Sequence, residues 1–465
     1  MAHKENITYR IENQQFFSEK TETDENGHQV YHFYSKQKAS EQKCPYCGGN
    51  VVGHGIRNVK LTDIPYMPGC RTIYHIHQHR YRCRECSHSF CEKNPFKVEG
   101  YNLTPRCIHW IFGLMQFKIP TMAIASICGI NWNTVRKLEK IKLDRVVSYR
   151  DQEMKDSAYR PYYLAVDEFA IRKGHRYATV VMDLVKGDVL WVGKGRAIKD
   201  FIHFFETYKD SDYLSAVKAV AMDMNASYNT LVKSYFPNVE IVYDRYHVQA
   251  QFGRDVLGQV RLEAARIHKQ TAKDLASQGQ PKETILQENK QYREIKNARG
   301  LILQNASSLS HEKEQRLNEI LQTHSDLAIC YAMKEELSTL FNLRDAHVAR
   351  EKWAHWFDAA ESSGIPALVK FARQKRKRID GLVAHASIPI NTGKLEGFNN
   401  KIKVAKRNAY GFRNLDFFFA YIRFLSIPRS SPIYRCRPAP ARRNRSFPVR
   451  RIAQSKGTFE ARHTT

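Results

Sequence analysis

Five short apolar runs between residues 162 and 247 constrain the fold of this chain more than any other feature. A helical pattern separates the third run from the fourth, and another separates the fourth from the fifth. The runs are 162–167, 177–183, 188–193, 217–223 and 239–244, and the helical patterns are 197–209 and 226–235. Short apolar runs that alternate with helical patterns predict an α/β sheet.

The order of these elements is that of a ribonuclease H-like domain, in which the first and fourth strands are neighbours at the centre of the sheet. Asp167 ends the first run, in Tyr-Leu-Ala-Val-Asp-Glu, and Asp223 ends the fourth, in Ala-Val-Ala-Met-Asp-Met. We therefore expect the carboxylates of these two residues to lie close together. A single Asp at a strand end is weak evidence, since such a residue often serves only the turn.

Glu396, in Gly-Lys-Leu-Glu-Gly-Phe-Asn-Asn, supplies a third carboxylate and opens a predicted helix. Magnesium is a hard cation that prefers carboxylate oxygen. Two such ions about 4 Å apart can activate the attacking oxygen of a phosphodiester reaction and stabilise the leaving one. The sequence therefore predicts that Asp167, Asp223 and Glu396 hold two Mg²⁺ ions, with Mn²⁺ as a possible substitute.

Asp244 competes with Asp223 for the second position, because it ends the fifth run in Asp-Arg-Tyr-His. We prefer Asp223, since the fourth strand is predicted to lie beside the first. The alternative role for Asp244 and His247 is local hydrogen bonding that fixes the start of the next helix.

The chain from 250 to 378 is helical and highly charged by pattern, so Glu396 is reached only after a predicted helical insertion. On the helix that carries Glu396, four polar residues recur at spacings of three and four and share one face. They are Asn399, Asn400, Lys403 and Arg407. We expect this face to hold metal at one end and to bind DNA phosphate along the rest, and a solvated basic helix is the alternative.

Two Cys-x-x-Cys pairs, Cys44/Cys47 and Cys83/Cys86, precede the sheet region. A two-residue spacer lets a tight turn present both thiolates to a tetrahedral metal. The pattern predicts a structural zinc site, and a redox pair or unligated core thiols are the alternatives.

Other candidate ligands lie near these pairs. Cys70 and Cys91 could substitute for one of the four cysteines. His75, His77 and His79 alternate on one predicted strand face, and this pattern is more typical of a polar sheet face than of a ligand set.

Residues 121–142 predict a helix-turn-helix. Gly129 can end the first helix and Asn131 can cap the second. Val135, Leu138 and Ile141 recur at helical spacing and should face inward. The polar residues that remain for a DNA groove or phosphates are Asn133, Arg136, Lys137 and Lys140. An ordinary helical hairpin between domains is the alternative.

Composition supports a polyanionic partner and several domains. The formal charge of +27 favours nucleic acid, with a basic ribosome-associated protein as the alternative. No apolar stretch reaches the ~18 residues of a membrane span, and no secretory signal is visible. We expect an irregular N-terminal segment (1–40), a zinc-binding module (41–98), a helix-turn-helix domain (104–150), a catalytic core (160–249 and 381–427), a helical insertion (250–380) and a basic disordered tail (428–465).

Together these motifs resemble the DDE transposases of bacterial insertion sequences, most closely those of the ISL-three group. The resemblance covers roughly residues 40–425 and rests on the cysteine pairs, the helix-turn-helix, Val-Asp-Glu, Met-Asp-Met, Asp-Arg-Tyr-His and Leu-Glu-Gly-Phe-Asn-Asn-Lys-Ile-Lys. In transposases of this type a C/D-x-x-H motif follows the second catalytic Asp. Asp244 and His247 match that motif, which supports Asp223 as the catalytic residue.

The resemblance implies metal-dependent cleavage and strand transfer at the ends of an element. It also implies double-stranded DNA as the partner, a cytoplasmic location in a bacterium, and a dimer or larger assembly on DNA, because two ends must be brought together. Two rival functions are a zinc-containing DNA-binding regulator descended from such an enzyme and a ribonuclease H-like nuclease without strand transfer. The tail after about residue 428 departs from the family pattern.

Overall fold

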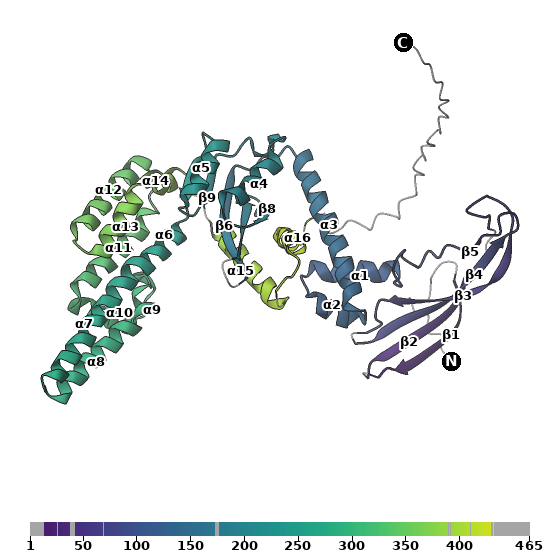
Figure 1. The fold of residues 1–465 in the computed structure, drawn as a ribbon, viewed down its shortest axis with the longest axis horizontal. Coiled ribbons are helices and arrows are strands. Elements are labelled where there is room, and N and C mark those ends of the chain that lie inside the picture. The colour runs from purple at the N-terminus through teal and green to yellow at the C-terminus, as the bar shows by residue number, and fades with distance from the viewer. Residues whose placement is uncertain are drawn as a thin grey trace, which may run out of the picture. The chain divides into compact units, whose positions relative to one another are not determined.

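The structure is a computed structural model, and it describes residues 14–25, 27–37, 42–67, 69–172, 176–388, 390, 392–409, 411–428 and 431. The predicted tail lies almost entirely outside the described residues. The chain forms two compact units (Figure 1). The N-terminal unit includes residues up to 117 and 124–130, and the larger unit includes 118–123 and 131–428.

A five-stranded sheet forms the N-terminal unit. Its strands run in the order β1-β2-β4-β3, and β5 pairs with β4. The bounds are β1 Gln14–Thr23, β2 Gln29–Gln37, β3 Val51–Asp63, β4 Arg71–Cys83 and β5 Ser89–Cys91. Phe33, Leu61, Tyr74 and Ile76 pack together on one face. The prediction of an irregular segment over 1–40 is wrong where the chain is described, because β1 and β2 complete this sheet and bury Phe33 in its core.

Three helices follow the sheet, and they are α1 (Pro105–Gln116), α2 (Thr121–Cys128) and α3 (Trp132–Asp156). Gly129 has a φ of +61° directly after α2, a conformation that favours glycine. The side chain of Asn131 accepts a hydrogen bond from the backbone N–H of Asn133 and caps α3. The predicted end of the first helix at Gly129 and the predicted cap of the second at Asn131 are confirmed. Helix α3 continues to Asp156, well beyond the predicted segment. The boundary between the two units falls within α2.

The larger unit contains a second sheet with the strand order β10-β9-β6-β7-β8. The bounds are β6 Tyr163–Arg172, β7 Arg176–Asp183, β8 Val189–Lys194, β9 Ala219–Met222 and β10 Glu240–Tyr243. β6, β7 and β8 are antiparallel neighbours, whereas β9 is parallel to both β6 and β10. The five predicted strands are therefore confirmed, and so is the prediction that the first and fourth of them are adjacent. The prediction that Asp167 ends its strand is wrong, because β6 stays paired with β7 as far as Arg172 and Asp167 lies within it.

Helices cover both faces of this sheet (Figure 1). Leu164 of β6 packs in one apolar cluster with side chains of α4 (Ile198–Tyr208) and α5 (Ala226–Tyr235). The next residue, Ala165, packs in another cluster with side chains of α15 (Gly393–Asn408) and α16 (Leu415–Ser426). Successive side chains of a strand point to opposite faces. Residue 167 therefore faces the α15 side, and residue 168 faces the α5 side.

The predicted insertion at 250–380 is helical wherever secondary structure is assigned in it. Helix α6 (Arg245–Phe252) leads into it from the sheet. A π-helical turn Gly253–Leu257 follows, and then α7 Gly258–Ser277, α8 Lys282–Asn297, α9 Arg299–Ile302, a 3-10 turn Ala306–Ser308, α10 His311–Thr323, α11 Ser325–Leu340, α12 Ala346–Ser362, α13 Pro366–Arg376 and α14 Ile379–Ser387. Buried aromatic residues of the insertion, such as Trp353 and Trp356, belong to the same apolar cluster as the α4 and α5 side chains. Among the described helices, none is both long and apolar enough to cross a membrane.

Candidate active site

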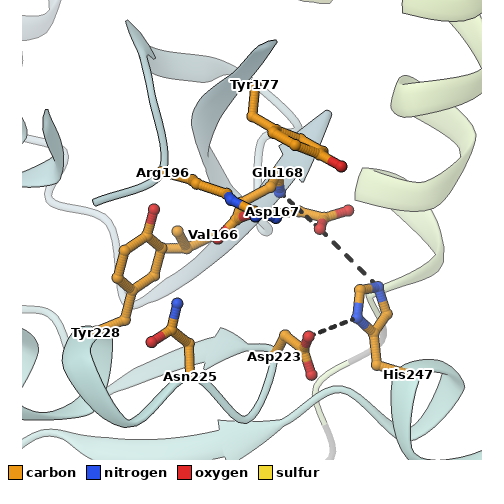
Figure 2. Close-up of a pocket in the computed structure, with 9 residues that line it drawn as sticks. All are labelled: Val166, Asp167, Glu168, Tyr177, Arg196, Asp223, Asn225, Tyr228 and His247. Carbon is orange, nitrogen blue, oxygen red and sulfur yellow. Dashed lines mark hydrogen bonds and ion pairs between the residues drawn. The ribbon is translucent and has the colours of Figure 1, made fainter. Parts of the chain in front are cut away.

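A cavity of about 370 Å³ lies beside the polar residues of β6 and those that directly follow β9 (Figure 2). Three of the residues that line it are carboxylates, and a histidine of α6 stands beside them. The full lining is Val166, Asp167, Glu168, Tyr177, Arg196, Asp223, Asn225, Tyr228 and His247. The structure therefore brings two of the three predicted catalytic carboxylates, Asp167 and Asp223, into one cavity.

The sheet register explains why these two side chains meet. Ala165 of β6 pairs in parallel with Ala221 of β9, so Asp167 and Asp223 follow at matching positions. His247 lies between them, as Figure 2 shows, with Nδ1 3.3 Å from Asp223 Oδ2 and Nε2 3.9 Å from Asp167 Oδ1. The Asp167 side chain is 20% exposed and that of Asp223 is 59% exposed, so both remain open to a ligand.

The pKa values of these groups follow from their surroundings. The hydrogen bond to Asp223, together with the charge of Asp167, raises the pKa of His247 to about 9. The same bond lowers the pKa of Asp223. Burial instead raises the pKa of Asp167. At neutral pH an imidazolium therefore stands between the two carboxylates and balances part of their charge.

Asp244 serves the helix rather than the cavity. Its side chain accepts a hydrogen bond from the backbone N–H of Tyr246 and caps α6. It follows β10, which lies one strand further from β6 than β9 does. Asp244 is not among the residues that line the cavity. The geometry therefore favours Asp223 over Asp244 as the second carboxylate of the cavity. It also gives the two predicted motif residues different roles, since Asp244 caps α6 and His247 contacts the carboxylates.

Helix α15 is attached to the cavity through Asn399. The side-chain amide of Asn399 donates a hydrogen bond of 2.5 Å to Asp167 Oδ2, and Asn399 is only 8% exposed. Its Oδ1 is buried and has no hydrogen-bond partner in the part of the chain that the structure describes. The prediction that Asn399 faces DNA is therefore wrong, because docking of α15 on β6 turns this residue toward Asp167.

Glu396 lies one turn before Asn399, in the first turn of α15, and it is exposed. It is not among the residues that line the cavity, and no metal-binding group of three or more side chains found among the described residues includes it. The structure thus places Glu396 on the helix that contacts Asp167, without bringing its carboxylate to the other two. Asn400, Lys403 and Arg407 of the same helix are exposed.

Besides the apolar Val166, five further lining residues were missed by the sequence analysis. Glu168 faces the α5 side, and burial raises its pKa. The Arg196 guanidinium lies over the Tyr177 ring, 4.2 Å from its centroid. Tyr228 shares a 2.9 Å hydrogen bond with Thr179. The fifth is Asn225, which caps α5. Only Glu168, adjacent to Asp167, carried a signal in the sequence.

The four predicted zinc ligands come together in the N-terminal unit. The Sγ atoms of Cys44, Cys47, Cys83 and Cys86 all lie within 4.8 Å of one another. The Cys44–Cys86 and Cys47–Cys83 pairs are 3.5 Å apart, near the ~3.8 Å expected from Zn–S bonds of about 2.3 Å in a tetrahedron. The backbone N–H of Cys86 lowers the pKa of Cys83 to about 6, whereas the pKa values of Cys47 and Cys86 are raised, so Cys83 is the member of the group that most favours the thiolate before a metal binds. The donor set therefore fits zinc.

Cys70 and Cys91 do not belong to this cysteine group. The alternating histidines of β4 make contacts within the sheet instead. His75 shares a 2.8 Å hydrogen bond with His32, and its ring stacks on Tyr34. His77 packs against Phe17, and His79 contacts the backbone carbonyl of Gln37. The interpretation of these histidines as a polar sheet face is consistent with the contacts.

On α3, three of the four predicted DNA-contacting side chains, Asn133, Lys137 and Lys140, are exposed. Arg136 is engaged within the larger unit. Its guanidinium lies 3.2 Å from the centroid of the Phe417 ring and 3.2 Å from Glu139. The prediction that Arg136 is free for DNA is therefore wrong, because α16 provides an aromatic surface that covers it.

Comparison with known proteins agrees with these observations. The chain is 33% identical over 406 residues to the transposase for insertion sequence element IS1001 of Bordetella parapertussis, covering 87% of this chain and 94% of that protein. It is 27% identical over 262 residues to the transposase for insertion sequence element IS1557 of Mycobacterium tuberculosis, covering 54% of this chain and 57% of that protein. A solved Drosophila P element transposase strand transfer complex aligns with 74% of this chain and 95% of its own at 10% identity and a TM-score of 0.33, too low to support a conclusion.

A family model described as a transposase, of the ISL3 (ISL-three) type, matches residues 164–422. This range contains both sheet carboxylates, His247, the helical insertion and Glu396. The match spans more than half of the chain, and the IS1001 relative is covered almost completely. On this evidence the chain belongs to the ISL3 family of DDE transposases, enzymes that act on DNA.

Proposed function

We propose that this enzyme cuts and joins DNA strands at the ends of an insertion sequence, using a ribonuclease H-like domain that holds two Mg²⁺ ions. Asp167, Asp223 and Glu396 are the proposed ligands. One observation carries the proposal: Asp167 and Asp223 follow matching positions of two adjacent parallel strands, and both line one cavity. The strand order β10-β9-β6-β7-β8 supports the fold assignment.

The residues of the cavity fit a divalent cation with oxygen ligands. Asp223 is open to solvent, and the Asn399 amide holds one oxygen of Asp167 and thereby orients the carboxylate. The buried Oδ1 of Asn399, which has no partner among the described residues, is a further oxygen ligand or an acceptor for bound water. Magnesium bound here would activate the attacking oxygen and stabilise the leaving one.

The third ligand requires α15 to settle more closely onto the sheet. Glu396 is exposed one turn from Asn399, which contacts Asp167, so a movement of the start of α15 toward the cavity would bring the Glu396 carboxylate nearer to Asp167. We propose that binding of DNA and magnesium favours this arrangement, because a metal ion offsets the repulsion among the carboxylates. Protonated His247 performs part of that role in the free protein.

The chain would carry out two phosphodiester reactions in sequence. The first hydrolyses a strand at the end of the element and leaves a 3′-hydroxyl. In the second reaction that hydroxyl attacks a phosphodiester of the target DNA, the bond from phosphorus to the target's own 3′-oxygen breaks, and the target strand leaves with a free 3′-hydroxyl while the element end is joined to its 5′ side. Both reactions use the same cavity, and both proceed on double-stranded DNA held by the rest of the protein.

The proposed DNA contacts come from exposed residues of two helices. On α3 they are Asn133, Lys137 and Lys140, and on α15 they are Asn400, Lys403 and Arg407. The positive charge of the chain would add a salt-dependent share of the affinity. We further propose that the four-cysteine site holds a structural zinc ion, and that at least two copies assemble on DNA because two element ends must be paired.

A strand-joining assay tests the proposal. The protein is incubated with a labelled DNA duplex from an end of its element, a target plasmid and Mg²⁺, and the products are separated on a gel. Cleaved ends joined to the plasmid are expected, and chelation of the metal should abolish them. Cleavage without joining would indicate a nuclease, and specific end binding without cleavage would indicate a regulator.

A further inference from the structure

The turn that carries Asp223 is short, and the sheet domain holds only part of it. The backbone N–H of Met224 donates to Asp223 Oδ1 at 2.6 Å, and the side chain of Asn225 caps α5. These contacts fix the turn where it joins α5. They leave the carbonyl and side chain of Met224 free to interact with another part of the chain.

The helical insertion makes that interaction from about 150 residues further along the chain. Lys375 on α13 places its Nζ 3.2 Å from the sulfur of Met224 and 2.5 Å from the side-chain oxygen of Gln251 on α6. Arg378, just after α13, donates a hydrogen bond from its guanidinium to the backbone carbonyl of Met224. Two cations of the insertion therefore converge on the residue next to Asp223.

Burial of the Lys375 ammonium at this position costs desolvation free energy. It is only 4% exposed, and its hydrogen-bond acceptors, Gln251 and Met224, are both neutral. Burial lowers its pKa to about 8, and the nearby Asp223 charge counteracts only part of that effect. A buried ammonium without a carboxylate in direct contact contributes little to stability. Its position against the turn indicates a role in shaping the cavity.

We propose that Lys375 and Arg378 are positioning residues that hold the 223–225 turn from the side of the insertion and set the Asp223 carboxylate for metal binding. The inference rests on the proposed magnesium site. It makes the insertion part of the active site without giving it a metal ligand. Supporting groups of this kind typically change metal affinity or activity about 10- to 100-fold when they are removed.

The test compares three variants of the full-length protein. Lys375→Met keeps the apolar stem and removes the ammonium, and Arg378→Gln removes the guanidinium. Arg376→Gln is the matched control, because Arg376 lies on α13 but pairs with Asp358 and Glu361 within the insertion. Mn²⁺ binding is measured by electron paramagnetic resonance without DNA. The Mn²⁺ bound by the wild type but not by Asp223→Asn is counted as bound in the active site. Mg²⁺-dependent cleavage of end DNA is measured in parallel.

We expect Lys375→Met and Arg378→Gln to bind active-site Mn²⁺ about 10- to 100-fold more weakly, with cleavage restored at high Mg²⁺ and end binding unchanged. Arg378→Lys should recover part of the affinity, since it keeps one donor for the Met224 carbonyl, and Arg376→Gln should match the wild type. If Lys375→Met does not fold, Arg378→Gln decides the question. Wild-type Mn²⁺ affinity in Arg378→Gln would overturn the inference. If wild-type protein and Asp223→Asn bind Mn²⁺ equally, the proposed metal site is wrong instead.

Discussion

Replacement of Asn399 by alanine should weaken both the fold of the larger unit and its chemistry. The side-chain amide of Asn399 donates to the Asp167 carboxylate at 2.5 Å in a nearly buried position. A hydrogen bond to a charged group contributes about 1.5–3 kcal/mol. The unpartnered Oδ1 of Asn399 offsets part of this, since its removal relieves a buried acceptor. We therefore expect Asn399→Ala to lower the free energy of unfolding by about 1–2.5 kcal/mol.

The effect on catalysis should be similar in free energy to the effect on stability. Without the amide, the Asp167 carboxylate loses its only side-chain hydrogen-bond donor from α15 that the structure describes. Strand cleavage should fall about 10- to 100-fold, as for other residues that orient a metal ligand. Unfolding in urea, followed by tryptophan fluorescence, and single-turnover cleavage of end DNA measure the two effects.

The adjacent residue provides the control. Asn400 is exposed, and within the described part of the chain its side chain accepts one long 3.4 Å contact, from Lys403. Asn400→Ala should therefore change the free energy of unfolding by no more than about 0.5 kcal/mol. Because Asn400 is a proposed DNA contact, the single-turnover cleavage rates are compared at saturating protein, where that of Asn400→Ala should match the wild type. If the two alanine variants behave alike in both assays, the contact between α15 and Asp167 does not support the active site.

Three further predictions concern the remaining groups. Cys83→Ala should lose stoichiometric zinc in a metal analysis, and retained zinc would remove Cys83 from the site. Asp223→Ala should abolish cleavage. Asp244→Ala should remain active and should lose about 0.5–2 kcal/mol of stability, because its helix cap is removed. An active Asp223→Ala protein together with an inactive Asp244→Ala protein would assign the catalytic role to Asp244. Because the pKa of His247 is raised to about 9, its charged form stabilises the fold most fully below about pH 6.5, and this contribution disappears as the pH rises through 9. The urea midpoint of wild type should therefore exceed that of His247→Gln at pH 6 and converge with it at pH 10; a constant difference would show that the charge is not responsible.

The sheet of the larger unit could be predicted from the sequence because its signals are local. Each strand is a short apolar run bounded by turn residues, and the order of runs and helices restricts the topology to a few arrangements. The same holds for the helix ends at Gly129 and Asn131, since caps depend on adjacent residues. The positions of Asp167 and Asp223 followed directly from the strand order.

Side chains that act between distant segments could not be predicted in this way. The face of α15 that meets the sheet is set by packing of the whole helix, so periodicity alone did not show that Asn399 turns toward Asp167. The sequence pattern of α3 predicted an exposed Arg136, because it contains no signal that Phe417 of α16 packs against the guanidinium. The contact of Arg378 with Met224 joins parts of the chain about 150 residues apart and leaves no local signal.

The central claim is that Glu396 joins Asp167 and Asp223 as the third carboxylate, although Glu168 is the third one that lines the cavity. The most direct measurement compares Mg²⁺-dependent cleavage of end DNA by Glu396→Gln and Glu168→Gln, with end binding measured to show that both variants are folded. We expect Glu396→Gln to bind the ends without cutting them, and Glu168→Gln to retain most of the cleavage. Full cleavage by Glu396→Gln, together with its loss in Glu168→Gln, would contradict the account and assign the third position to Glu168.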